Sequence, residues 1–149
     1  VLAATAMGAD YPIRHVAPIV WPWDTRADMA KIATEAGERI GVEASFEGED
    51  IELFEDFVGP GYGEVTPGCL EAMAVLARTE GILVDPSYSG KALAGLIDHI
   101  RSGQLDPEQP VVFVHTGGTP ALFVYNEVLS EQIAARSLPQ GQRQATEGC

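Results

Sequence analysis

Residues 81–97 read GILVDPSYSGKALAGLI and join an apolar run to an amphipathic segment through a polar turn. The run at 82–84 is typical of a buried parallel strand. Leucine and isoleucine side chains then recur at helical spacing, which predicts a helix from Gly90 to about Arg101. The turn between them, 85–90, carries two serines and a tyrosine, although glycine or asparagine would reverse the chain equally well. The stretch therefore predicts a strand, a turn and a helix, with a chemical role for the turn.

The same alternation continues along the chain in both directions. Strands or extended segments are expected at 13–20, 51–58, 82–84 and 111–115, and helices at the start of the chain, at 25–40, 67–79 and 90–101, and from the turn at 116–120 to about Leu129. Strands that alternate with helices over short loops predict an α/β fold, a parallel sheet with helices on both faces. Ligands bind at the carboxyl ends of such strands, which singles out the loops 85–90 and 115–118.

Composition narrows the classes of partner. The chain has 149 residues and a net charge of −13, so one domain is expected and neither nucleic acid nor an anionic membrane is an expected partner. No segment has the length of a membrane span, and two cysteines, Cys69 and Cys149, give no disulfide framework. We therefore expect a cytoplasmic protein. A folded domain is expected over 1–132, followed by a polar tail over 133–149.

Taken alone, each of three short motifs is explained more simply as a structural turn than as a binding site. The glycines of GPGYG at 59–63 lack the spacing of a dinucleotide-binding loop, and SGK at 89–91 lacks the upstream glycine of a phosphate loop. The turn Thr116-Gly117-Gly118 has the form of an anion-binding nest. The three histidines are scattered without ligand spacing, so no metal site is expected.

Taken together in order, the motifs are specific. They are G-Y-G at 61–63, A-R-T-E-G-I-L-V-D-P-S-Y-S-G-K at 77–91 and H-T-G-G-T-P-A-L at 115–122. In this order the chain resembles the C-terminal portion of the family of D-cysteine desulfhydrase and 1-aminocyclopropane-1-carboxylate (ACC) deaminase. These are pyridoxal-phosphate (PLP) enzymes with the fold of the tryptophan synthase β subunit, PLP fold type II. The resemblance runs from Gly59 to Tyr125 and more loosely back to Val1.

The resemblance implies roles for six residues. Tyr62 and Tyr88 match two catalytic tyrosines close to the substrate, and Ser89, Thr116, Gly117 and Gly118 match cofactor-binding positions. Deaminases resemble one another in having glutamate and leucine where this chain has Ser89 and Thr116, a pattern similar to the desulfhydrase branch. A neutral hydroxyl supports protonation of the pyridine nitrogen less than a carboxylate does, which suits β-elimination of a good leaving group. Thr116 is expected at the ring nitrogen and Ser89 near the ring edge.

Two parts of the family pattern have no counterpart here, the Schiff-base lysine and the Ser/Gly-rich phosphate loop. The lysines of the chain are Lys31, on a charged helix face, and Lys91, which matches a structural lysine of the family. We therefore expect a complementary N-terminal chain as partner, within a dimer of such units. Alone, this chain is expected neither to hold the cofactor covalently nor to catalyse.

Three functions follow as hypotheses. The first is β-elimination from a small amino acid, with D-cysteine giving pyruvate, sulfide and ammonia, and cysteate as a rival substrate. The second is ACC deamination, which Ser89 and Thr116 disfavour. The third is a non-catalytic partner of a complete paralogue. Trp21 and Trp23 depart from the family pattern and are expected in core and surface packing, with an interface to the missing half as the alternative.

Overall fold

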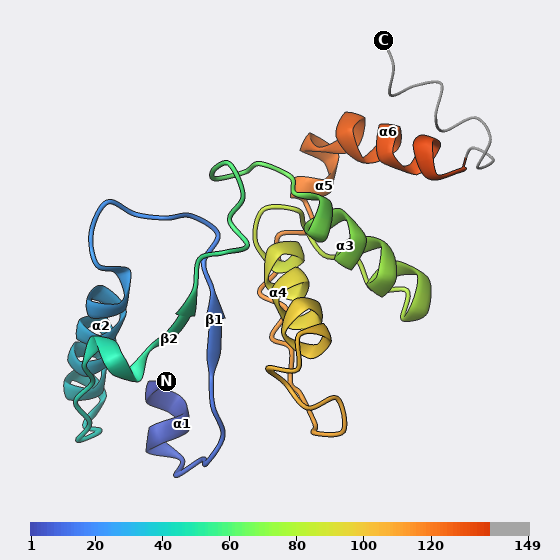
Figure 1. The fold of residues 1–149 in the computed structure, drawn as a ribbon. Coiled ribbons are helices and arrows are strands. Elements are labelled where there is room, and N and C mark those ends of the chain that lie inside the picture. The colour runs from blue at the N-terminus through green and yellow to red at the C-terminus, as the bar shows by residue number, and fades with distance from the viewer. Residues whose placement is uncertain (138–149) are drawn as a thin grey trace.

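A computed structural model describes residues 1–137 of the chain (Figure 1). The expected tail, 133–149, therefore lies largely outside the described residues, as does Cys149. In chain order the elements are α1 (Leu2–Ala6), β1 (Arg14–Val16), α2 (Thr25–Ile40), the 3₁₀ helix η1 (Gly48–Asp50), β2 (Glu52–Phe54), α3 (Pro67–Thr79), α4 (Ser89–Arg101), α5 (Ala121–Val124) and α6 (Asn126–Ser137).

Strands β1 and β2 form a parallel pair in which His15 lies opposite Leu53, and α2 connects them. Alternate side chains of a strand point to opposite faces. Leu53 accordingly packs with Ala30 of α2, and its neighbour Phe54 contacts the ring of His99 of α4. Figure 1 shows α2 and α4 on opposite sides of the two strands. The predicted α/β fold, with a parallel sheet between helices, is confirmed.

The helix boundaries follow local signals in the sequence. Asp24 caps α2 by accepting a hydrogen bond from the Ala27 N–H (3.0 Å), and Gly41 ends that helix in the left-handed conformation, with φ 75°. Thr66 caps α3 in the same way, and Pro67 opens its first turn. In the described part of the chain no helix is long and apolar enough to cross a membrane.

Helices α3 and α4 pack against each other around Ala72, Val84, Leu93 and Ala94 (Figure 1). Space is very restricted at Gly90 of α4, where a Cβ atom would lie 2.5 Å from the Asp85 carbonyl oxygen and 2.7 Å from Cys69 Sγ. Only glycine fits there. The turn 85–90 is therefore pressed directly against the end of α3 at which that helix begins.

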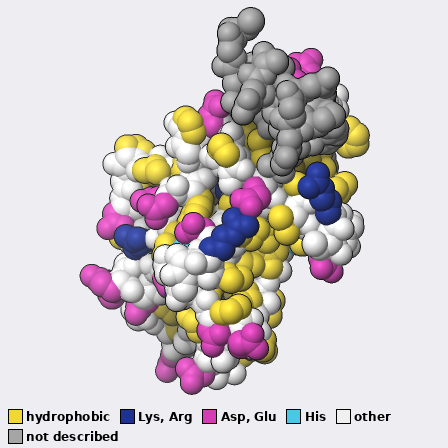
Figure 2. All heavy atoms as spheres, turned by 45° about the vertical axis from the view of Figure 1, so that its right-hand side comes forward, with side chains coloured by type: hydrophobic (Ala, Val, Ile, Leu, Met, Phe, Trp, Pro, Cys, Tyr) yellow, Lys and Arg dark blue, Asp and Glu magenta, His cyan; other side chains and the backbone are white. Residues whose placement is uncertain are grey.

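The strands predicted at 82–84 and 111–115 are wrong, because neither segment forms a strand in the described structure. Side chains link the two segments instead, since His115 Nε2 donates to the Leu83 carbonyl at 3.0 Å and Phe113 packs against the cluster that contains Val84. Apolar sequence favours a strand only where a neighbouring backbone completes a ladder, and none does so here. Side chains at 82, 83, 112 and 114 are exposed instead. In Figure 2, hydrophobic side chains reach the surface between the charged ones.

The last helical region also differs from the prediction of one short helix ending near Leu129. The chain forms α5 and then α6, with Tyr125 between them. Helix α6 continues to Ser137, so the expected domain boundary after residue 132 falls inside it.

Candidate active site

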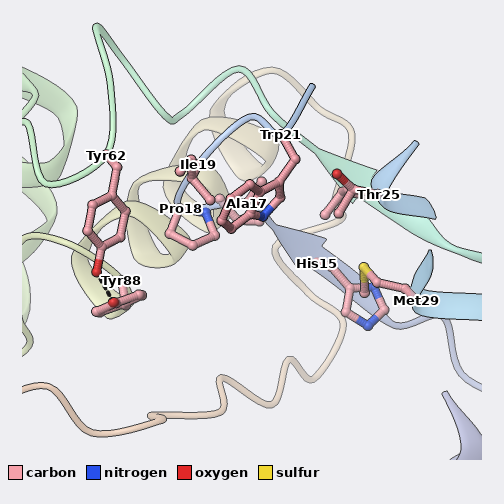
Figure 3. Close-up of a pocket in the computed structure, with 11 residues that line it drawn as sticks. His15, Ala17, Pro18, Ile19, Trp21, Thr25, Met29, Tyr62 and Tyr88 are labelled. Carbon is pink, nitrogen blue, oxygen red and sulfur yellow. Dashed lines mark hydrogen bonds between the residues drawn. The ribbon is translucent and has the colours of Figure 1, made fainter. Parts of the chain in front are cut away.

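The two predicted catalytic tyrosines lie together. Tyr62 lies in the loop between β2 and α3, and Tyr88 is the residue directly before α4. Their hydroxyl groups are hydrogen-bonded to each other. Their rings meet edge to face, with centroids 5.9 Å apart and planes at 65°. Residues 26 positions apart are thus brought into direct contact at one wall of a cavity (Figure 3).

The cavity has a volume of about 580 Å³ and is mostly apolar. Besides the two tyrosines, its lining residues are His15, Val16, Ala17, Pro18, Ile19, Trp21, Thr25, Met29 and Leu53. Figure 3 shows the tyrosines at one end of this group and Thr25 and His15 toward the other. The Thr25 hydroxyl oxygen is buried and has no hydrogen-bond partner among the described residues, so it is available to a polar ligand group.

Trp21 is not a core residue. Its ring stacks on that of Trp23, with centroids 4.7 Å apart and planes at 16°, and the two residues are 44% and 52% exposed. Of the two, Trp21 lines the cavity that Tyr62 and Tyr88 share. The segment in which the sequence departs from the family pattern therefore contributes to the wall of the candidate site.

Asp85 organises the turn that carries Tyr88. It is fully buried, and its carboxylate accepts hydrogen bonds from the backbone N–H groups of Ser87 (2.8 Å), Tyr88 (2.7 Å) and Ser89 (2.9 Å). The Ser89 hydroxyl donates a fourth at 2.5 Å. Burial opposes ionisation of Asp85, but these hydrogen bonds outweigh it and lower its pKa below the ordinary value. The carboxylate thus fixes three consecutive residues of the turn.

The predicted cofactor residues divide into two groups. Ser89 is buried, and its hydroxyl lies within reach of Asp85 and of the Gly117 carbonyl (3.2 Å). The Thr116 side chain is exposed, and within residues 1–137 nothing hydrogen-bonds its hydroxyl. Thr116 is therefore free to contact a ligand, whereas Ser89 supports the turn. None of Ser89, Thr116, Gly117 and Gly118 lines the cavity of the two tyrosines.

Besides the Ser89 hydroxyl, two further contacts hold the turn at 116–118. A Cβ atom on Gly118 would lie 2.4 Å from the Asp85 Oδ1 atom, so this close approach requires glycine. His115 Nδ1 accepts from the Gly117 N–H at 3.0 Å, while its Nε2 donates to Leu83. Because an N–H group only donates and a carbonyl only accepts, the imidazole carries its proton on Nε2. His115 therefore has a structural role in this turn.

Neither lysine reaches the cavity. Lys91 is fully buried, and its Nζ donates to the carbonyl groups of Val58 (2.6 Å) and Gly61 (3.2 Å). Burial lowers the pKa of its ammonium group. The side chain of Lys31 is 71% exposed and pairs with Glu35 on the surface of α2. Lys91 thus supports the Tyr62 loop from behind, in agreement with the structural role that the resemblance implied.

Sequence reasoning missed two residues of the site, Asp85 and Tyr125. Asp85 followed by Ser87 is a recognisable Asx-turn pattern, so a local signal was present. The Tyr125 hydroxyl donates to the Gly63 carbonyl at 2.8 Å, across 62 residues of sequence, and no local pattern predicts that contact. No group of three or more metal-ligating side chains occurs in residues 1–137.

In an α/β fold with a parallel sheet, ligands bind beside the loops that follow the strands, as expected for the loops of this site. The family model described as pyridoxal-phosphate dependent enzyme matches residues 14–117. The chain therefore belongs to the family of pyridoxal-phosphate-dependent enzymes.

Relatives within this family are more specific. A D-cysteine desulfhydrase of Salmonella schwarzengrund is 37% identical over 131 residues, which cover 83% of this chain and 40% of the relative. A D-cysteine desulfhydrase of Salmonella typhi is 49% identical over 77 residues, 52% of this chain and 24% of the relative. The chain thus spans at most about 40% of the length of these relatives.

A solved structure of an ACC deaminase homologue superposes with a TM-score of 0.76 at 28% identity. The match covers 87% of this chain and 38% of that structure. It supports PLP fold type II, and it confirms the predicted resemblance to the desulfhydrase and deaminase family.

Proposed function

We propose that this chain is part of a PLP-dependent lyase that eliminates a β-substituent from a small amino acid. D-cysteine is the model substrate, and with one water it would give pyruvate, hydrogen sulfide and ammonia. The observation that carries the proposal is the contact between the Tyr62 and Tyr88 hydroxyls on the wall of one cavity. The D-cysteine desulfhydrase relatives supply the substrate class.

The chain offers suitable groups for the cofactor. When bound, PLP supplies an electron sink that stabilises negative charge at the substrate's α-carbon. The free hydroxyl of Thr116 would contact the ring nitrogen as a neutral partner, and Gly117 beside it leaves open space for a ligand, since a Cβ atom there would meet nothing within 4 Å. Ser89 would not touch the cofactor but would hold the turn in place through its hydrogen bonds to Asp85 and the Gly117 carbonyl. The unpartnered Thr25 hydroxyl, which lies in the cavity of the two tyrosines rather than beside Thr116, offers a further polar group to a ligand.

The tyrosine pair would handle a proton at its phenol oxygens. The hydrogen bond with Tyr88, partial burial and the nearby charge of Asp85 raise the pKa of Tyr62. Tyr62 therefore keeps its proton near neutral pH, so its hydroxyl is available as a hydrogen-bond donor to a departing group. Tyr88, whose backbone N–H is held by Asp85, would keep that donor in place.

The lysine that binds PLP would come from a further polypeptide segment, because Lys91 is committed to two carbonyl groups and Lys31 pairs on the surface. The limited coverage of the relatives is consistent with such a segment. The exposed apolar side chains of Ile82, Leu83, Val111, Val112 and Val114 offer it an apolar surface. We expect a dimer of such assembled units.

The first test is the intact mass of the natively purified protein together with its visible absorption. A second polypeptide with a PLP absorption band supports the proposal. In that complex, Tyr88→Phe should abolish most of the turnover of D-cysteine, and Tyr11→Phe, on an exposed tyrosine outside the site, should leave it unchanged. Unchanged turnover in Tyr88→Phe would favour the alternative of a non-catalytic partner.

A second candidate is ACC deamination, which the ACC deaminase homologue of similar fold favours. The hydroxyls of Ser89 and Thr116 weigh against it. Products separate the two, since release of 2-oxobutanoate from ACC identifies the deaminase and release of sulfide from D-cysteine identifies the lyase.

A further inference from the structure

The loop that carries Tyr62 has little regular structure of its own. Tyr62 stands between Gly61 and Gly63, and Gly63 has a φ of 78°, a backbone conformation that residues other than glycine rarely adopt. No strand or helix includes residues 59–64. The position of the Tyr62 hydroxyl therefore depends on what binds the backbone on either side of it.

Both flanking carbonyl groups are bound by side chains from elsewhere. Lys91 Nζ donates to the Gly61 carbonyl at 3.2 Å, and the Tyr125 hydroxyl donates to the Gly63 carbonyl at 2.8 Å. Tyr125 also restricts the space beside Gly63, where a Cβ atom would lie 3.0 Å from its hydroxyl oxygen. The backbone is thus fixed immediately before and immediately after Tyr62.

The same hydroxyl reaches the other tyrosine loop. Tyr125 accepts a hydrogen bond from Ser87 Oγ at 3.0 Å, and Ser87 directly precedes Tyr88. Ser87 is itself held through its backbone N–H by Asp85. One phenol between α5 and α6 therefore joins the residue after Tyr62 to the residue before Tyr88.

We propose that Tyr125 is a positioning residue that sets the contact between the Tyr62 and Tyr88 hydroxyls. The role rests on the proposed function in that the pair is taken as catalytic. Tyr125 is not in the cavity lining, so it acts through Gly63 and Ser87 rather than on a substrate. Its hydroxyl uses both of its hydrogen-bonding capacities for this purpose, one as donor and one as acceptor.

Tyr125→Phe tests the proposal with little change in volume, because it removes one oxygen and keeps the ring. The chain has four tyrosines, so ¹³C-labelled tyrosine gives four assignable ring signals, with Tyr62→Phe and Tyr88→Phe as assignment variants. We expect Tyr62 in Tyr125→Phe to ionise at a lower pH than in the unaltered chain, because its hydrogen bond to Tyr88 is loosened. Asp85 and Tyr88, the ionisable groups that act on Tyr62, are retained.

Ser87→Ala is the second variant, since it removes the other end of the same link. It should shift Tyr62 in the same direction, and the double variant should shift it no further than the larger single change. Tyr11→Phe is the matched control and should leave the Tyr62 signal and its ionisation unchanged. If Tyr125→Phe lowered only the melting temperature and left the Tyr62 ionisation where it was, the positioning role would be overturned.

In the assembled enzyme, Tyr125→Phe should lower kcat by roughly ten- to a hundred-fold, the scale of a small misplacement of a reacting group. The KM should change little. The titration needs neither cofactor nor partner. Absence of turnover in every variant would therefore count against the proposed function, while the Tyr62 ionisation would still decide the role of Tyr125.

Discussion

The two strands β1 and β2 and the two loops of the candidate site are stabilised by different means. The strands share a backbone ladder and bury Ala17, Ile51 and Leu53 against Ala30 of α2. The site loops, 85–90 and 115–118, have no ladder, and buried polar contacts centred on Asp85 hold them. The strands are held by a repeated pattern of backbone hydrogen bonds and apolar contacts. The positions of the site loops depend instead on a few individual polar groups.

The difference has an energetic consequence. Apolar contacts are nearly independent of one another and of pH, so losing one leaves the rest in place. Members of a buried polar network depend on one another, because a partner left unsatisfied in a dry environment is costly. The site loops should therefore be the region in which one substitution has the larger effect.

The largest effect is expected for Asp85→Asn. The amide nitrogen cannot accept, so in either orientation of the amide two of the four donors lose their acceptor, the N–H groups of Ser87 and Tyr88 or the N–H and hydroxyl of Ser89. At about 1–3 kcal/mol each, we expect a loss of about 4 kcal/mol in the free energy of unfolding. Urea denaturation measures it. Asp98→Asn, on the exposed face of α4, is the control and should change little. Equal stability of Asp85→Asn and the unaltered chain would contradict the proposed dependence on the carboxylate.

Ile51→Ala tests the other region. Ile51 is 3% exposed and belongs to the apolar cluster beside β2, so its truncation should cost about 3 kcal/mol through lost burial and a cavity. The ionisation of Tyr62 should not change in this variant, because no contact of the tyrosine pair involves Ile51. A shifted Tyr62 titration would show that the two regions are coupled more strongly than the contacts indicate.

Low pH should affect the stability contributions of the two regions differently. The pKa of Asp85 in the folded chain lies below its ordinary value, so its contribution is complete above about pH 3.9 and is lost as the pH falls through the lowered pKa. The stability difference between the unaltered chain and Asp85→Asn should therefore be constant from pH 7 to 5 and shrink below about pH 4. The difference for Ile51→Ala should stay level, and parallel curves for both variants would refute the assignment.

The smallest effect is expected for the reactivity of Cys69, which lies where α3 contacts the turn 85–90. Its thiol donates to the Pro86 carbonyl at 3.3 Å, and burial raises its pKa to about 12. In a Cys149→Ser background, iodoacetamide at pH 8 should scarcely react with the folded chain and should label it in urea. Rapid labelling without urea would mean that the turn opens readily from α3.

Local sequence signals predicted the helices well. Asp24 and Gly41 at the ends of α2, and Thr66 and Pro67 at the start of α3, act through groups a few residues away, so a pattern can reveal them. The strand predicted at 82–84 was wrong, because an apolar sequence does not reveal whether a neighbouring backbone is present to pair with it.

The candidate site was predicted unevenly for a similar reason. Tyr62 and Tyr88 were found through the resemblance of ordered motifs, and the structure places them in contact. Asp85 left a local trace in its turn. Tyr125 left none, because its contacts to Gly63 and Ser87 cross 62 and 38 residues of sequence and exist only after folding.

The close approach of Gly118 to Asp85 bears on protein engineering. The glycine turn and the Asp85 turn are complementary in shape, since a Cβ atom on Gly118 would overlap the Asp85 carboxylate. A designer who transplants HTGG into another α/β scaffold would have to move the DPSYSG turn with it. The two loops form a single transferable unit, although the 24 residues 91–114 separate them in the sequence.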